Sequence, residues 1–483
     1  MVQTTAADGW RRSAPESQGI RSEAILGFLR RIEAEEQELH GLMIVRNGHV
    51  VAEGAWAPYR LDMPHDLYSL SKSFTSTAIG LAVEEGKLSL DDPVLSFFPE
   101  EVTPAIEDNM KDLRIRHLLT MTTGHTVDTI PILQASPDGN WVRAFLGTPI
   151  EREPGTLFVY NSGASYMLSA ILHRATGEHL LDWLRPRLFE PLGIAGVTTM
   201  TCPRGIHAGG YGIYMKVGDI AKFGQLYLQE GVWEGRRILS AEWVRMATAK
   251  QTDNGDDPSS DWSQGYGFQF WRCRHGAYRG DGMFGQFCIV IPHRQAVVAI
   301  TSGTREMQRI LNAVWDELLP GMEDGPVGRP DDAARRELEE RLRSLSYPAA
   351  ASGETGDIAR WSGRVWRVAD NPVGIRTLAL TFAEGGAELA LGLPVGEQRL
   401  RIGHGEWTEG FLRVPGFDLP VCASGRWVGR DAYEIDLRYL VFAFHDRLTC
   451  RFDDNRLKVT VERSLPIQGE GLLPAELSGE AES

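Results

Sequence analysis

Residues 68–76 of the chain read Tyr68-Ser69-Leu70-Ser71-Lys72-Ser73-Phe74-Thr75-Ser76, which sets a serine three positions before a lysine. The run that follows, Thr-Ala-Ile-Gly-Leu-Ala-Val, favours a helix with a largely apolar surface. Residues three apart on a helix share one face, so the Lys72 amine can reach the Ser69 hydroxyl. We interpret Ser69 as a nucleophile and Lys72 as its base, because a serine attacks only when a nearby group accepts its proton.

The surroundings of Lys72 suit a general base. The lysine lies in an apolar run, and burial lowers the pKa of an amine because desolvation disfavours the charged form. The start of the helix adds partial positive charge beside Ser69, which favours a developing anion there. A capping serine followed by a solvated lysine is the common alternative explanation of this spacing. However, the chain has seven lysines against 43 arginines, and Lys72 alone follows a serine at this distance.

The composition is that of a globular protein with more than one domain. At 483 residues, the chain is expected to form two or three domains of roughly 150 residues each. The formal net charge of -15 and the lack of a basic run argue against nucleic acid as a partner. The N-terminus lacks the apolar core of a signal peptide, and no run of about eighteen apolar residues follows. We therefore expect a cytoplasmic protein that does not bind membranes.

The cysteines give no sign of a metal site or a disulfide frame. They are spread along the chain without a Cys-x-x-Cys pair or a histidine at ligand spacing, at Cys202, Cys273, Cys288, Cys422 and Cys450. We interpret them as buried small hydrophobic residues, and we expect neither a metal nor a cofactor.

Helix and strand patterns alternate on both sides of the Ser-Lys pair. Residues 22–38 predict an amphipathic helix, and Asn47-Gly48 between two apolar runs predicts a hairpin. Later segments predict strands at 265–271, 287–291 and 296–301, a turn at 279–285, and a closing helix at 306–319. Together these patterns indicate a sheet covered by helices.

A second candidate constellation is Tyr160-Asn161-Ser162-Gly163, which precedes a helix-forming run. A tyrosine at such a junction can serve packing alone. Its phenol can also relay a proton if adjacent positive charge holds it partly ionised. Because the Ser-Lys pair lies upstream, we interpret Tyr160 as this relay.

Composition also divides the chain into domains. We expect a catalytic domain over residues 1–325, a linker with a charged helix over 326–347, and a second domain over 348–466. The second domain consists of short alternating segments separated by Gly, Asp and Asn turns, which is typical of an antiparallel barrel or sandwich. We expect the tail, residues 467–483, to be disordered.

Three motifs in order make residues 17–320 resemble a known superfamily. Ser69-x-x-Lys72, Tyr160-Asn161-Ser162 and Gly280-Asp281-Gly282 resemble the motifs of the serine beta-lactamases and penicillin-binding proteins. The resemblance is greatest to the class C beta-lactamase-like branch, which also contains carboxylesterases, D-amino-acid peptidases and nylon-oligomer amidases. It implies an α+β fold in which helices flank an antiparallel sheet, with an all-helical region between Ser69 and Tyr160.

The resemblance also implies the role of each site residue. Ser69 would be acylated, Lys72 would deprotonate it, and Tyr160 would protonate the leaving group and later activate water. The backbone N–H groups of Ser69 and Met283 would form an oxyanion hole, which stabilises the tetrahedral intermediate. The residues at which we expect the substrate to bind are Asn161, Ser162, Gly280, Asp281 and Gly282.

Two departures from the family pattern bear on the substrate. The second motif is usually Y-x-N, whereas its third position here is Ser162. The third motif usually begins with a lysine that helps to bind a substrate carboxylate, and Gly280 stands in its place. No lysine lies between Lys250 and Lys458, and the nearby cations are Arg274, His275 and Arg279. Efficient beta-lactamase activity is therefore less expected than esterase activity.

The leading hypothesis is a serine hydrolase that cleaves esters or small amides through an acyl-enzyme. A beta-lactamase or a D-amino-acid peptidase or amidase is the nearest alternative, and a non-catalytic binding or scaffolding protein with the same fold is an alternative of another class. An alpha/beta-hydrolase is disfavoured because the chain lacks G-x-S-x-G. We expect specificity to depend on residues 128–140 and 251–264. The sequence leaves open whether the chain forms a homo-oligomer.

Overall fold

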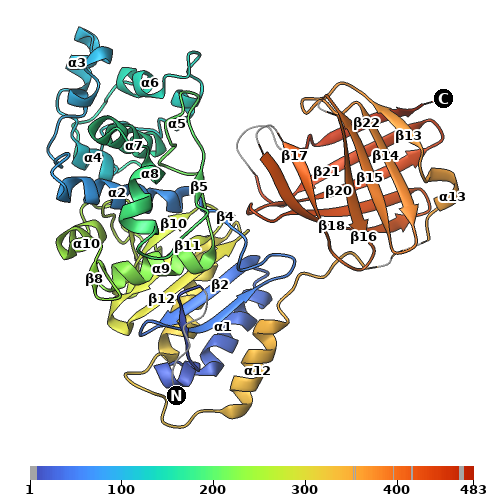
Figure 1. Cartoon of the computed structure of the whole chain (residues 1–483), viewed down its shortest axis with the longest axis horizontal. Coiled ribbons are helices and arrows are strands. Elements are labelled where there is room, and N and C mark those ends of the chain that lie inside the picture. The colour runs from blue at the N-terminus through green and yellow to red at the C-terminus, as the bar shows by residue number, and fades with distance from the viewer. Residues whose placement is uncertain are drawn as a thin grey trace. The chain divides into compact units, whose positions relative to one another are not determined.

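The computed structural model describes residues 8–351, 353, 355–394, 396–414, 417–466 and 473–482. The chain forms two compact units, which Figure 1 shows. The first contains Met1–Gly54 and Pro64–Arg343, and the second contains Ala55–Met63 and Ser344–Ser483. A short segment that precedes Ser69 in sequence therefore belongs to the second unit.

The first unit is built on a mainly antiparallel sheet with the strand order β1-β3-β2-β12-β11-β10-β9. The short pairing of β1 with β3 is parallel, whereas the neighbours from β9 to β2 pair antiparallel. The strands are β1 (Arg11–Arg12), β2 (Leu39–Arg46), β3 (His49–Ala55), β9 (Trp271–Arg272), β10 (Tyr278–Gly282), β11 (Gln286–Ile291) and β12 (Ala296–Ser302).

The predicted hairpin at Asn47-Gly48 is confirmed. Both residues have positive φ, 51° and 75°, which suits the tight turn that joins β2 to β3. Every residue of β2, β11 and β12 is buried, so helices must cover both faces of the sheet.

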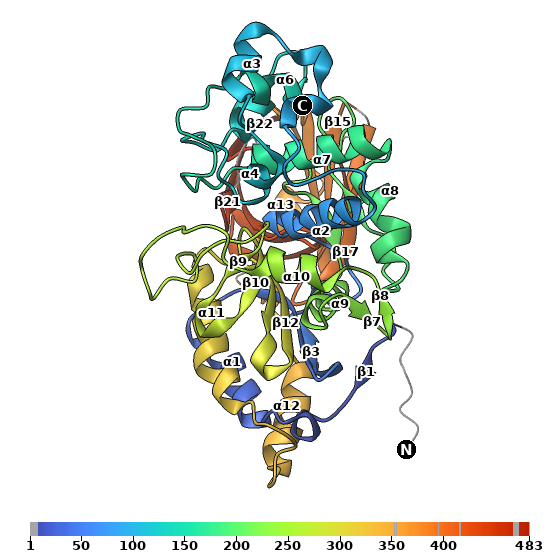
Figure 2. The same ribbon diagram turned by 90° about the vertical axis from the view of Figure 1, so that its left-hand side faces the viewer.

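Two helical layers cover this sheet. Helix α9 (Val217–Leu228) packs on β2, β11 and β12. Helices α1 (Ser22–Ala34), α11 (Met307–Ala313) and α12 (Asp332–Arg343) lie on the other side (Figure 2). The predicted helices over residues 22–38 and 306–319 are thus confirmed in shortened form. The charged helix expected in the linker is α12, and it packs against α1 within the first unit.

The region between Ser69 and Tyr160 is helical, as the resemblance implied. Its centre is α2 (Ser71–Glu84), which packs against α7 (Ser162–Thr176). The surrounding helices are α3 (Pro104–Met110), α4 (Ile115–Leu119), α5 (Ile130–Gln134), α6 (Trp141–Gly147), α8 (Leu180–Leu184) and α10 (Ala241–Thr248). Short strand pairs border this region, formed by β4 (His65–Asp66), β5 (Thr198–Thr199), β6 (Ile213–Met215), β7 (Val232–Trp233) and β8 (Arg236–Arg237).

Two local predictions near the third motif are wrong. Residues 265–271 do not form a strand, apart from Trp271 at the start of β9, because Gln269 has a left-handed φ of 61° that breaks an extended run. Residues 279–282 belong to β10, where each pairs with a residue of β11, rather than to a turn. The turn is limited to residues 283–285, where Phe284 and Gly285 have positive φ.

The second unit is an antiparallel barrel, so the predicted C-terminal all-β domain is confirmed. The strands pair antiparallel in the order β16-β15-β14-β13-β22-β21-β20-β19-β18-β17, and a short parallel pairing of β16 with β18 closes the ring. Phe382, Trp427, Tyr433 and Phe452 pack against one another inside it. The unit contains α13 (Ile358–Trp361), β13 (Val365–Val368), β14 (Thr377–Ala383), β15 (Gly386–Leu393), β16 (Gly396–Gly403), β17 (Thr408–Val414), β18 (Phe417–Gly429), β19 (Ala432–Tyr439), β20 (His445–Asp453), β21 (Arg456–Arg463) and β22 (Glu476–Ala481).

The prediction of a disordered tail needs correction. Residues 467–472 and 483 lie outside the described residues, but β22 (Glu476–Ala481) is a strand that pairs with both β13 and β21. The segment was missed because it is short and acidic, so its alternation is weak. Its buried residues Leu477 and Gly479 alternate with exposed ones, as in a half-buried strand.

Candidate active site

Ser69 lies in a tight turn directly before helix α2. The turn is the short 3-10 helix Tyr68–Leu70, and Tyr68 has a positive φ of 46°. The carboxylate of Asp66 accepts a hydrogen bond from the Tyr68 backbone N–H at 2.8 Å, which stabilises this conformation. Burial raises the pKa of Asp66 to about 7. The predicted position of Ser69 at the start of the helix is therefore confirmed.

Lys72 is buried, and its amine contacts three oxygen atoms from distant parts of the chain. The side chain is 1% exposed. Its Nζ lies 3.1 Å from Ser69 Oγ, 3.1 Å from Ser162 Oγ and 2.7 Å from the Gly210 carbonyl oxygen. Ser69 reaches the amine from the turn before α2, and Ser162 reaches it from the first position of α7.

The pKa of Lys72 is lowered to about 7. Burial causes the shift, because the charged amine loses its hydration, and the carboxylates of Asp128 and Asp281 partly oppose it. In its neutral form the amine has two donor protons and one lone pair for these three oxygen neighbours. Such an amine can donate to Gly210 and Ser162 and accept the proton of Ser69 on its lone pair. The burial of Lys72 and its 3.1 Å distance to Ser69 Oγ agree with the sequence expectation, and its role as the base stays a prediction.

Tyr160 lies beside the Ser-Lys pair. Lys72 Nζ is 4.8 Å from the centre of the Tyr160 ring, and Trp271 stacks on that ring with 5.4 Å between the ring centres. Burial raises the pKa of Tyr160, and a hydrogen bond with Ser69 opposes the rise only in part. This direction favours the protonated phenol over the partly ionised one considered from the sequence, and the role of Tyr160 as a proton relay stays a prediction.

Asn161 and Ser162 differ in their roles. Asn161 is fully buried and caps α7, with its side-chain oxygen accepting hydrogen bonds from Ala164 and Thr129. Ser162 points its hydroxyl at Lys72, as described above. The structure thus brings Ser162 to the amine and places Asn161 in the helix cap, and substrate binding by Asn161 stays a prediction.

Two contributors to the site were missed by sequence reasoning. One carboxylate oxygen of Asp128 accepts hydrogen bonds from the backbone N–H groups of Ser162, at 2.8 Å, and Ile130, at 3.0 Å. Gly209 and Gly210 fit between α2 and α7, where a Cβ on Gly209 would meet Ser169 and the Ser165 carbonyl oxygen. The consecutive glycines before Tyr211 were the available signal for this close approach.

The third motif packs against the turn that carries Ser69. A Cβ on Gly280 would overlap Leu70, and one on Gly282 would overlap the carbonyl oxygen of Leu67. These glycines therefore allow β10 to approach the nucleophile turn closely. Met283 follows at the end of β10, and its side chain is 47% exposed. The role of its backbone N–H in an oxyanion hole stays a prediction.

Of the cations considered from the sequence, Arg279 lies closest to the chemistry. Its guanidinium is fully buried and forms an ion pair with Asp281 at 2.7 Å. Arg274 instead pairs with Asp261, and His275 packs on Trp315. Asp281 of the third motif is 8% exposed, and its carboxylate is paired with Arg279. Its negative charge raises the pKa of Lys72 and so partly opposes the effect of burial.

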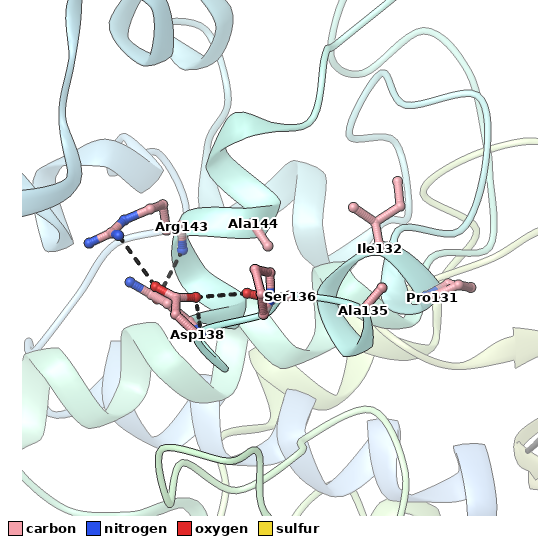
Figure 3. A pocket seen from close by; sticks show the side chains of 9 residues that line it. Pro131, Ile132, Ala135, Ser136, Asp138, Arg143 and Ala144 are labelled. Carbon is pink, nitrogen blue, oxygen red and sulfur yellow. Dashed lines mark hydrogen bonds and ion pairs between the residues drawn. The ribbon is translucent and has the colours of Figure 1, made fainter.

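A separate surface cavity of about 750 Å³ lies between α5 and α6 (Figure 3). Pro131, Ile132 and Ala135 form its apolar side, and Asp138 and Arg143 form its polar side. Ser69, Lys72 and Tyr160 do not line it. Most of its lining belongs to residues 128–140, the stretch expected to influence specificity, and Arg143 and Ala144 of α6 complete it.

The five cysteines are buried and unbridged. Within the described ranges, no group of His, Cys, Asp and Glu side chains is arranged to hold a metal ion. No helix of the described part is long and apolar enough to cross a membrane.

Comparisons with known proteins agree with this architecture. Residues 29–317 match the family model described as Beta-lactamase. A 6-aminohexanoate-dimer hydrolase from Paenarthrobacter ureafaciens is 24% identical over 322 residues, which cover 62% of this chain and 81% of that protein. Esterase EstB from Burkholderia gladioli is 30% identical over 173 residues, 32% of this chain and 43% of the esterase. A penicillin-binding-protein homologue from Caulobacter crescentus superimposes with a TM-score of 0.50 at 16% identity, covering 62% of this chain and 99% of its own, and supports the fold alone.

Proposed function

The chain belongs to the beta-lactamase family, and we propose that it is a serine hydrolase that cleaves ester or small amide bonds through an acyl-enzyme on Ser69. One observation carries the proposal. The buried Lys72 amine, with a pKa lowered to about 7, lies 3.1 Å from the Ser69 hydroxyl oxygen. A neutral amine at this distance can take the serine proton as the hydroxyl attacks.

In the acylation step, Ser69 Oγ bonds to the substrate carbonyl carbon while its proton moves to Lys72. The carbonyl oxygen becomes an oxyanion, for which the backbone N–H groups of Ser69 and Met283 are the expected donors. The tetrahedral intermediate then collapses and breaks the bond to the alcohol or amine. Tyr160 supplies the proton that the leaving group needs, and Lys72 returns the proton to Tyr160.

In the deacylation step, water takes the place of the leaving group. Tyr160 passes its proton to the neutral Lys72 amine as it takes one from the water, and the water oxygen bonds to the acyl carbon. The tetrahedral intermediate then breaks its bond to Ser69 Oγ, which takes the proton from Lys72 as the acid is released. Because burial raises the pKa of Tyr160, the phenol is protonated at the start of each step and acts as a donor before it acts as an acceptor.

The burial of Arg279 favours esters over beta-lactams as substrates. Gly280 stands where the family pattern has a lysine, and the nearby guanidinium of Arg279 is buried in an ion pair with Asp281. Because the guanidinium is completely buried, a substrate carboxylate would have to displace the residues that cover it to be bound by Arg279. Esters and small uncharged amides need no such partner. The esterase among the relatives supports the ester class.

The experiment is a burst assay with p-nitrophenyl esters, followed by intact-mass detection of the acyl adduct. The full-length chain is expected to release a burst of product and to gain the mass of one acyl group. Ser69→Ala is expected to lose both. Ser76→Ala, a change at a buried serine further along α2, is the matched control and is expected to keep both.

Other outcomes separate the alternatives. Undiminished hydrolysis by Ser69→Ala would refute the nucleophile. Turnover of a chromogenic cephalosporin at a rate similar to that of esters would favour a beta-lactamase, and release of D-amino acids from peptides would favour a D-peptidase. Failure of a fluorophosphonate probe to label Ser69 would favour a non-catalytic binding protein. Cytoplasmic location, the absence of a nucleic-acid partner and a homo-oligomeric state stay predictions.

A further inference from the structure

Gln269 lies among the helices that carry the proposed catalytic residues. Its backbone has a positive φ of 61°, and its side chain is 2% exposed. Glutamine rarely adopts this conformation, so its surroundings must hold it in place. Figure 2 shows α2, α4 and α7 grouped above β9, the strand that begins two residues after Gln269.

The polar groups of Gln269 bond to three helices. Ser165 of α7 donates its hydroxyl proton to Oε1 at 2.6 Å, and Ser73 of α2 donates to the backbone carbonyl oxygen at 2.9 Å. The amide Nε2 donates to the carbonyl oxygens of Leu118, at 3.1 Å, and Leu119, at 2.9 Å, in α4. The backbone N–H also donates to Leu119, at 3.2 Å. One residue therefore links α2, α4 and α7.

The linked serines adjoin the catalytic groups. Ser73 directly follows Lys72, and Ser165 lies about one turn after Ser162 on the same face of α7. Lys72 Nζ contacts Ser69 and Ser162 at once, each at 3.1 Å. A shift of about 1 Å between α2 and α7 would break one of these contacts, and misplacement on this scale reduces catalytic rates strongly.

We propose that Gln269 is a positioning residue, which fixes α2 and α7 at the separation that lets the Lys72 amine contact both Ser69 and Ser162. The proposal rests on the proposed function of Ser69 and Lys72. Gln269 acts through the helices rather than on the substrate. Glutamine suits the position because its tip offers one acceptor and two donor protons. A glutamate of the same shape would replace the N–H donors that face Leu118 and Leu119 by oxygen.

The test compares Ser165→Ala, Gln269→Glu and Gln269→Ala with Gln225→Ala, a matched change at a buried glutamine of α9. Each variant is assayed for kcat, KM and the pH dependence of kcat/KM with a p-nitrophenyl ester. The three variants at the link are expected to lower kcat by about tenfold or more while KM changes less than threefold. They are also expected to shift the pH at which kcat/KM falls on the acid side, because a movement of α7 against α2 changes the burial of Lys72 that lowers its pKa. The control is expected to keep kcat and the profile.

The double variant Ser165→Ala with Gln269→Ala is expected to lose no more activity than Gln269→Ala alone, because both changes break the same link. The proposal is overturned if Ser165→Ala and Gln269→Glu keep the parent kcat and pH profile and change only the melting temperature. Ser165→Ala removes a single hydroxyl, so it remains informative if Gln269→Ala fails to fold. Loss of the burst from the parent protein would instead refute the proposed function itself.

Discussion

At the scale of single residues, the acid-base behaviour of Lys72 decides the pH range in which Ser69 can be activated. The amine is buried, and burial lowers its pKa to about 7 while Asp128 and Asp281 oppose the shift. Protonated Lys72 cannot accept a proton, so activity requires the neutral form. The same residue placed on the surface would stay charged up to about pH 10.

We predict that kcat/KM rises with pH through about 7, the pKa of Lys72, and falls toward acid pH. Ester hydrolysis measured between pH 5 and about 9 in buffers of constant ionic strength checks this. A profile that is flat across neutral pH would contradict the assignment of Lys72 as the base.

Asp128→Asn is predicted to move this acid limb to lower pH. The variant keeps a side-chain oxygen that can accept from Ser162 and Ile130, but it removes a negative charge that raises the pKa of Lys72. The pH profile of kcat/KM is the readout, with Asp108→Asn as the control, because Asp108 pairs with Lys111 on the surface. An acid limb that stays where it is in the parent protein, or moves to higher pH, would contradict an action of the Asp128 charge on Lys72.

At the scale of secondary-structure elements, the site depends on how closely β10 approaches the turn that carries Ser69. Gly280 and Gly282 make this approach possible, because neither has a Cβ to meet Leu70 or the Leu67 carbonyl oxygen. The Leu67 carbonyl also accepts a hydrogen bond from Leu70, so it helps to shape the turn. A side chain at Gly280 or Gly282 would therefore push against the turn that carries Ser69.

Gly282→Ala is predicted to lower kcat/KM by at least tenfold and to destabilise the protein by about 1–3 kcal/mol, as overpacked positions do. The new methyl group would push against backbone, which cannot rotate away as a side chain can. Ester kinetics and denaturant unfolding measure the two effects. Gly147→Ala is the control, because no atom lies within 4 Å of a Cβ at that position. Equal kinetics in the two variants would count against the close approach.

At the scale of the whole molecule, the chain builds two units of different architecture, and the last described strand completes the second. Strand β22 pairs with β13 on one side and β21 on the other. Without it, both neighbours would present unpaired backbone groups, and the barrel would have two open edges. The C-terminal residues are thus part of the structure of the second unit.

Leu477→Ala is predicted to destabilise the barrel by about 2–5 kcal/mol, the usual cost of truncating a buried leucine. Leu477 is 5% exposed, and its neighbour Ser478 is exposed. A substitution of Ser478 by alanine is the control, and it should change the free energy of unfolding by about 0.5 kcal/mol or less. Hydrogen exchange followed by mass spectrometry resolves the two units. Faster exchange is expected in peptides from β13 and β21 of Leu477→Ala, but not in peptides from β10 and β11. Uniform protection in all of them would refute the role of β22.

Much of the fold followed from local patterns. The Asn47-Gly48 hairpin, the helices near 22–38 and 306–319, and the change to short alternating strands after residue 348 depend on interactions between residues close in sequence, which a pattern records. The pairing of Ser69 with Lys72 is of the same kind, because a helical turn brings residues three apart together. The Ser-Lys pair was therefore recognisable from nine consecutive residues.

The features that give the Ser-Lys pair its chemistry come from elsewhere in the chain. Ser162 and Gly210 lie 90 and 138 positions away from Lys72, and they meet its amine only when α7 and the glycine-rich segment pack on α2. Gln269 takes its left-handed conformation because three helices surround it, against the extended pattern of its own segment. Burial of Lys72, which lowers its pKa, is a property of the assembled core rather than of any neighbouring residue. Desolvation and hydrogen bonding over such distances depend on which atoms surround a group in space, and local sequence does not record that.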